Sequence, residues 1–177
     1  MVVKKKKAIK KNAKKNIVLE TNKGNVTIEL FSSLAPKHCE RILQLAKEKY
    51  FDEVVFHRVI EGFMAQTGDG QFGSLKNGFQ VDRAGMGGSE LPNLEAEFTS
   101  EPFVRGIVGM ARSQDPNSAN SQFFIMLEDG HFLNGNYTVF GKVTRGMNNV
   151  HKIKKGNSEF NGSVDDPDEI LTAKIKY

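Results

Sequence analysis

The chain has 177 residues, of which 38% are hydrophobic and 26% charged, and this size and composition allow one globular domain to bury its own core. No apolar run approaches the roughly 20 residues that a membrane helix needs, and no apolar stretch follows the basic N-terminus as it would in a signal peptide. We therefore exclude fibrous and membrane-spanning classes and expect a cytoplasmic location, or a nuclear one if the source is eukaryotic.

The net charge of +4 at pH 7 originates in the first residues of the chain. Residues 1–15 contain eight Lys and no acidic residue, which leaves 17 Lys and Arg against 21 Asp and Glu in the remainder. Such a segment cannot offset its own ordering entropy, so we predict a flexible tail at 1–15 and one domain at 16–177. The tail suggests nucleic-acid binding only weakly, because it lacks interleaved aromatic residues.

The first elements of the predicted domain are a hairpin and a helix. Two β-branched runs separated by turn residues predict the hairpin over 17–30. A helical apolar stripe then predicts an amphipathic helix over 36–50, with Ser32 or Ser33 as its N-cap. The only cysteine, Cys39, excludes an intramolecular disulfide and is expected to pack within this helix.

The rest of the chain is dominated by short strands. A strand-like pattern at 54–67 is followed by a Gly-rich stretch without a period at 68–94, which we interpret as a long surface loop. The remaining elements are expected at 106–111, 121–127 and 137–143 as strands, 147–154 as a helix, and 169–176 as a last strand. Many short strands with two helices predict a mainly β, antiparallel, closed or nearly closed structure.

One strand-like stretch, FHRVIEGFMAQ, combines a cation, large apolar side chains and an amide. Side chains alternate along a strand, so Arg58 and Gln66 are expected on one surface. Phe63 has the opposite parity and joins them only if Gly62 permits a kink. His57 is expected to be a satisfied core histidine, and no histidine in the chain shows metal-ligand spacing.

Three blocks now occur in a recognisable order: FHRVI-x-GFM-x-Q, then GMAR with SQFFI about ten residues later, then FLNGNYTVFGKV. This order resembles the cyclophilin family of peptidyl-prolyl cis/trans isomerases, and the likeness extends from Ile17 to Tyr177. The resemblance implies an eight-stranded antiparallel closed β-barrel capped by two α-helices, with a packed interior and no cofactor. It also implies a shallow outer groove that accepts a proline ring.

The resemblance further assigns roles to individual positions. Arg58, Phe63 and Gln66 match the catalytic positions, with Arg58 as the hydrogen-bond donor to the proline nitrogen in the twisted transition state. Eight further positions match the substrate-binding surface: Met64, Ala111, Arg112, Gln122, Phe124, Phe132, Leu133 and Tyr137.

Three of these positions depart from the best-known eukaryotic members. Arg112 stands where those members have Asn, Phe132 where they have Trp, and Tyr137 where they have His. The last two resemble variants of bacterial members, so isomerase activity is expected to survive. Because the Trp indole N–H is missing, we expect weakened affinity for the cyclic peptide cyclosporin.

The leading interpretation is an isomerase that accelerates rotation of Xaa-Pro bonds in unfolded or partly folded proteins and so assists their folding. The alternative is a cyclophilin-fold binding module or chaperone that holds proline peptides with little turnover. A third interpretation makes the Lys-rich tail the main binding element, with the barrel as its carrier. No coiled-coil pattern or apolar stripe calls for a dimer, so we expect a monomer without membrane partners.

Overall fold

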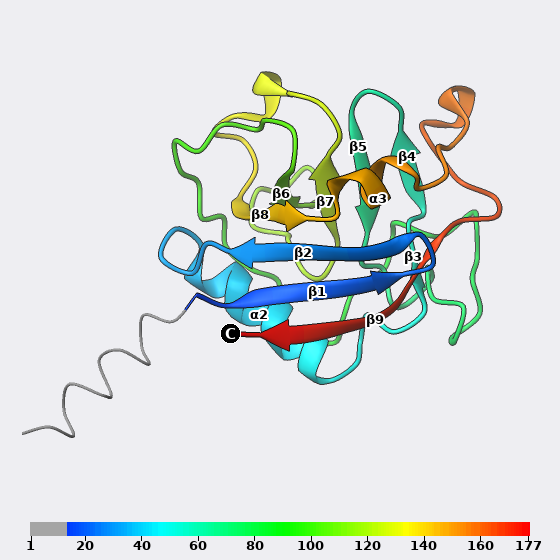
Figure 1. Cartoon of the computed structure of the whole chain (residues 1–177), viewed down its shortest axis with the longest axis horizontal. Coiled ribbons are helices and arrows are strands. Elements are labelled where there is room, and N and C mark those ends of the chain that lie inside the picture. Colours follow the sequence, from blue (N-terminus) through cyan, green and yellow to red (C-terminus); the bar gives the residue numbers. More distant parts are fainter. Residues whose placement is uncertain (1–13) are drawn as a thin grey trace, which may run out of the picture.

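Figure 1 shows the computed structural model of the chain, in which residues 14–177 are described. The predicted tail at 1–15 therefore lies outside the described residues except for its last two positions. Of these, Lys15 already belongs to the folded part, since its carbonyl oxygen accepts a hydrogen bond from the Leu30 N–H at 2.9 Å.

One antiparallel sheet contains every strand of the described part, in the order β3-β9-β1-β2-β8-β6-β7-β5-β4. Only two residues separate the two strands at its ends, β3 (Val54–Val55) and β4 (Arg58–Ile60). The sheet must therefore curl round until its ends lie close together. The other strands are β1 (Asn16–Thr21), β2 (Gly24–Leu30), β5 (Met64–Thr67), β6 (Ile107–Met110), β7 (Phe123–Met126), β8 (Val139–Arg145) and β9 (Glu169–Lys176).

The mainly β, antiparallel, barrel-like architecture is confirmed, but the sheet has nine strands rather than the expected eight. The stretch 54–67, which was expected to be one strand, contains three: β3, β4 and β5. The chain changes its pairing partner from β9 to β5 after β3, and it turns at Glu61–Phe63 between β4 and β5. Strand propensity indicated an extended chain there, whereas pairing divides it into three.

Two α-helices pack on the sheet: α2 (Pro36–Lys47) against β9, and α3 (Met147–His151) against β2 (Figure 1). Both end earlier than expected. The predicted serine N-cap of α2 is wrong, because Ala35 occupies that position and makes no side-chain capping bond. The carboxylate of Glu97 instead accepts the N–H groups of Lys37 and His38, at 3.2 and 2.9 Å. Two short 3-10 helices, η1 (His131–Leu133) and η2 (Ser158–Phe160), were not predicted.

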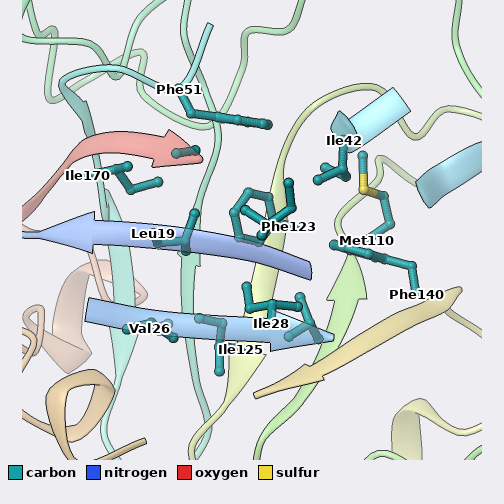
Figure 2. Packing of buried hydrophobic residues seen from close by; sticks show 14 of the residues in the cluster. Leu19, Val26, Ile28, Ile42, Phe51, Met110, Phe123, Ile125, Phe140 and Ile170 are labelled. Carbon is teal, nitrogen blue, oxygen red and sulfur yellow. The ribbon is translucent and has the colours of Figure 1, made fainter. Parts of the chain in front are cut away.

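The interior of the curled sheet is a packed apolar core, to which Leu19, Ile28, Ile170 and Phe123 contribute (Figure 2). Phe123 makes edge-to-face contacts with Phe51 and Phe140, at centroid distances of 5.6 and 6.0 Å. The helix residue Cys39 is buried against the same core, so its predicted packing role is confirmed.

A second, smaller apolar cluster lies on the other face of β5 and β7. Because side chains alternate along a strand, Ala65 and Ile125 enter the main core, whereas their neighbours point the opposite way. The residues of this outer cluster are Met64, Phe103, Ile107, Phe124, Met126, Leu133 and Val139. The sheet thus has a packed interior and an apolar floor on its outer surface.

A long irregular segment joins β5 to β6, as expected, and extends to Gly106. It is ordered around Asp69, whose buried carboxylate accepts four backbone N–H groups. Arg41 of α2 donates to the carbonyl oxygen of Pro92 in a later part of the segment and to that of Asn120 between β6 and β7, so it connects the two. Neither α-helix within residues 14–177 has the length and hydropathy needed to cross a bilayer.

Candidate active site

A groove of about 480 Å³ lies over the outer apolar cluster, on the face formed by β4, β5 and β7. Nine of the eleven site residues expected from the sequence line it, although they come from five separate parts of the chain. These nine are Arg58, Phe63, Met64, Gln66, Ala111, Arg112, Phe124, Leu133 and Tyr137.

The floor of the groove is apolar because β5 and β7 present alternate side chains to it. Met64 and Phe124 are buried there, and Leu133 closes one end from η1. Phe63 joins them although strand parity placed it on the opposite face. Gly62 has a φ of +72°, which turns the chain between β4 and β5, so the predicted glycine kink is confirmed.

The polar side of the groove is organised around the pairing of β4 with β5. Arg58 and Gln66 lie opposite each other in the ladder, and Arg58 Nη1 donates to Gln66 Oε1 at 3.4 Å. The amide nitrogen of Gln66 donates in turn to Gln122 Oε1 at 3.0 Å. This chain of hydrogen bonds sets the orientation of the Gln66 amide.

Two expected residues do not line the groove. Gln122 lies beside Gln66 and lines an adjoining pocket with it, and its amide nitrogen donates to the carbonyl oxygens of Gly85 and Gly87 at 2.9 and 2.8 Å. Phe132 lies at the rim, 70% exposed, with its ring centroid 5.4 Å from that of Phe63. Gln122 is therefore placed to support the groove, and Phe132 to extend it.

Arg58 is held from a second direction by Asn161. Its Nε donates to the backbone oxygen of Asn161 at 2.9 Å, and its Nη2 donates to Asn161 Oδ1 at 3.0 Å. Partial burial lowers the pKa of Arg58, but a guanidinium remains protonated at any physiological pH. The groove thus contains a cation whose donors have fixed directions.

A second cation lies at the opposite wall. The guanidinium of Arg112 stacks over the ring of Tyr137, 4.3 Å from its centroid, and donates to the backbone oxygen of Asn136. The Tyr137 ring in turn meets Phe124 edge to face at 6.0 Å. Within residues 14–177, neither Arg58 nor Arg112 forms an ion pair with a carboxylate.

His57 also borders the groove and is 5% exposed. Its predicted burial is confirmed, but the expectation of satisfied ring nitrogens is wrong, since neither nitrogen has a partner among the described residues. Burial lowers the pKa of His57 to about 4, and the charge of Arg58 acts in the same direction, while Asp69 opposes it. His57 is therefore a neutral wall residue at pH 7.

Several lining residues were missed by the sequence reasoning. They come from the irregular segment after β5 and from the chain before β9: Ala84, Gly85, Met86, Phe160, Asn161 and Ser163. Neither segment has a hydrophobic period. The available signal was the presence of Met86 and Phe160 as large apolar residues in polar surroundings. Within residues 14–177, no three His, Cys, Asp or Glu side chains form a group suited to a metal ion.

Comparison with known proteins assigns the chain to a family. Residues 16–175 match the sequence model described as "Cyclophilin type peptidyl-prolyl cis-trans isomerase/CLD". The chain belongs to the cyclophilin family. Its groove lies on the outer surface of the curled sheet and is lined by nine of the residues expected from the sequence.

Curated cyclophilin relatives match most of the chain. A "Probable peptidyl-prolyl cis-trans isomerase" of Brucella suis biovar 1 is 58% identical over 160 residues, which cover 90% of this chain and 82% of the relative. A "Peptidyl-prolyl cis-trans isomerase-like 1" of Aspergillus fumigatus is 36% identical over 166 residues, covering 90% of this chain and 94% of the relative.

A solved cyclophilin from Cryptosporidium parvum superimposes with a TM-score of 0.80 at 29% identity, covering 93% of this chain and 99% of that one. A second structure of the same protein was obtained in the presence of the dipeptide Ala-Pro. It gives a TM-score of 0.78 at 30% identity over 92% of this chain and 99% of that one. The cyclophilin fold is thus shared over nearly the whole described chain.

Proposed function

We propose that the groove binds Xaa-Pro segments of unfolded or partly folded proteins and accelerates rotation about the bond before proline. The observation that carries this proposal is the position of Arg58, whose guanidinium borders an apolar floor large enough for a proline ring. The Cryptosporidium parvum cyclophilin obtained in the presence of Ala-Pro supports the same substrate class.

The chemistry follows from the electronic structure of the peptide bond. An Xaa-Pro bond is planar because the nitrogen lone pair is delocalised into the carbonyl, and rotation meets a barrier of about 18–20 kcal/mol. At the twisted midpoint the nitrogen regains its lone pair and becomes a hydrogen-bond acceptor. A fixed N–H donor beside it therefore binds the transition state better than either planar state. We assign that donor to Arg58.

The other groove residues supply positioning. Phe63, Met64, Phe124 and Leu133 hold the proline ring against the outer apolar cluster. Gln66, the backbone near Arg112 and the rim around Tyr137 contact the chain that precedes proline. The mechanism needs no covalent step, because positioned donors and an apolar seat lower the barrier together.

A single charge-assisted hydrogen bond is sufficient for a measurable effect. Such a bond contributes about 1.5–3 kcal/mol, and about 1.4 kcal/mol of selective transition-state binding gives a tenfold rate. Loss of the Arg58 side chain should therefore slow turnover by a factor of roughly ten to a hundred.

The test is exchange between the cis and trans forms of a short Ala-Pro peptide, measured by NMR with the intact protein and with Arg58→Ala. Arg105→Ala is the matched control, because Arg105 is an exposed arginine that donates to His151 away from the groove. Acceleration by the intact protein and the control, but not by Arg58→Ala, supports the proposal. Binding without acceleration would favour the proline-binding module in its place.

We also propose that the protein acts as a cytoplasmic monomer and that the tail at 1–15 takes no part in turnover. All nine groove residues expected from the sequence and the hydrogen bonds that hold Arg58 come from a single copy of residues 14–177. Sedimentation of the full chain across a concentration series tests the monomer, since a rising molecular mass would contradict it.

A further inference from the structure

The edge of the sheet next to the groove is covered by a loop. β4 is the last strand in the sheet order, so the side of β4 turned away from β5 has no strand partner in the described part. The loop at 156–164 takes that place. Gly156 N–H donates to Val59 O at 2.8 Å, and Val59 N–H donates to Gly162 O at 2.9 Å.

The loop packs closely against β4 and against itself. Gly162 has a φ of +82°, and a Cβ at this position would lie 2.5 Å from Ile60 Cγ1. A Cβ at Gly156 would collide with the carbonyl group of Gly162. Gly162 therefore permits a close approach between loop and strand, Gly156 permits a close approach between the two arms of the loop, and Asn161 lies between these two glycines in sequence.

Asn161 has a backbone conformation that few residues adopt easily. Its φ is +56°, in the left-handed region, which Asn tolerates better than most other non-glycine residues. In this conformation its backbone oxygen and its side-chain oxygen both point at one guanidinium. They accept from Nε and Nη2 of Arg58, at 2.9 and 3.0 Å.

The pattern of donors shows what this arrangement does to Arg58. A guanidinium has five N–H groups in one plane. Asn161 binds two of them and Gln66 a third, which leaves one N–H on each terminal nitrogen without a partner among residues 14–177. Because the guanidinium is planar, acceptors on two of its edges determine where the remaining donors point.

We propose that Asn161 is a positioning residue for Arg58, holding the guanidinium in its productive orientation before substrate arrives. This inference rests on the proposed isomerase function. Asn161 acts through Arg58 and does not itself need to touch the turning peptide bond. Removal of its side-chain oxygen should therefore slow the rotation step while leaving the affinity for proline peptides nearly unchanged.

The experiment uses Asn161→Gly, which keeps the left-handed backbone and the backbone acceptor but loses Oδ1. Ser158→Gly is the matched control, since Ser158 is an exposed residue of the same loop. NMR exchange with an Ala-Pro peptide should show a kcat that is roughly tenfold below wild type for Asn161→Gly and within about twofold of wild type for Ser158→Gly. KM should change little in both variants.

Two further measurements separate positioning from a general structural effect. In an Arg58→Ala background, Asn161→Gly should have no additional effect on kcat, because its target is absent. The second measurement keeps Arg58 and uses NMR of its guanidinium nitrogens to measure rotation about the Cζ–Nη2 bond. This rotation should be faster in Asn161→Gly than in Ser158→Gly.

The outcomes that overturn the inference are equally specific. An unchanged kcat in Asn161→Gly, or an equal loss in the Arg58→Ala background, contradicts it. Failure of the isomerase function itself has a different signature, in which the wild-type protein does not accelerate exchange at all. The guanidinium rotation would still show whether Asn161 orients Arg58, so the two failures can be told apart.

Discussion

The long segment between β5 and β6 should depend on one carboxylate, that of Asp69. One of its oxygens accepts the N–H groups of Gln71 and Phe72 at 3.0 and 2.9 Å. The other accepts those of Gly85 and Gly87 at 2.8 and 3.0 Å. The carboxylate thus joins two parts of the segment that are far apart in sequence, and the second part borders the groove.

The substitution Asp69→Asn keeps the shape of the side chain but replaces one acceptor oxygen by an NH₂ group. Two of the four backbone donors then face another donor. An unsatisfied buried donor costs about 1–3 kcal/mol, so the free energy of unfolding should fall by about 2–6 kcal/mol. That is a large part of the total free energy of unfolding, which is about 5–15 kcal/mol for typical folded domains. At about 2–4 °C per kcal/mol for a chain of this size, a loss of about 4 kcal/mol lowers Tm by roughly 8–16 °C.

Thermal unfolding followed by circular dichroism measures this effect. Asp115→Asn is the control, because Asp115 is an exposed carboxylate that accepts one backbone N–H within its own turn. A change of less than about 0.5 kcal/mol is expected there. Amide hydrogen exchange at Gly85 and Gly87 should accelerate in Asp69→Asn before global unfolding. If Asp69→Asn melts within about 2 °C of wild type, the claim that the substitution leaves two buried N–H groups without an acceptor is refuted.

Four further predictions concern the groove and the tail. The pKa of His57 is about 4 in the folded protein and about 6.5 in the unfolded chain. As the pH falls from about 6.5 to about 4, the unfolded chain therefore binds a proton that the folded protein does not, and the free energy of unfolding decreases. His57→Gln should remove about 2–3 kcal/mol of the loss between pH 7 and pH 4.5 in urea titrations, and an unchanged loss would exclude His57 as its source. Phe132→Trp restores an indole N–H and should strengthen inhibition by cyclosporin roughly tenfold, whereas equal inhibition would show that this N–H is not limiting. Arg112 lacks a carboxylate partner in the described part, so peptides with Glu beside proline should be turned over faster than those with Lys. Arg112→Gln or added salt should reduce that preference, and a preference insensitive to both would contradict an electrostatic origin. Deletion of residues 1–13 should leave the exchange rate of an Ala-Pro peptide unchanged, and a slower rate would show that the tail assists turnover.

The local sequence pattern predicted the structure correctly where strand alternation alone decided which face a residue occupies. The alternation of side chains along a strand placed Arg58 and Gln66 on one surface, and the antiparallel pairing of β4 with β5 brings them opposite each other. The same rule identified Gly62 as the position that would bring Phe63 into the groove. These predictions held because strand geometry has a period of two that does not depend on distant parts of the chain.

The local sequence pattern predicted the structure wrongly where a segment distant in sequence provided the hydrogen-bond partners. Ser32 and Ser33 are good capping residues, yet the α2 N-terminus is bonded by Glu97, which lies about 60 residues further along. The stretch 54–67 was expected to be one strand, but its two ends pair with strands on opposite ends of the sheet order. In each case a tertiary partner satisfied the backbone more completely than the local one.

The sequence by itself determined the strand-rich class, the hairpin and the last strand, because these follow from periodicity and from residue type. It also supplied the motif residues that meet in the groove, through their resemblance to the cyclophilin family. Only the tertiary structure decided that the loop at 156–164 covers the edge of β4 and brings Asn161 to Arg58. The two residues are separated by about a hundred positions, and no period relates them. Their contact depends on the curl of the whole sheet, which leaves β4 at an edge whose backbone groups must find partners.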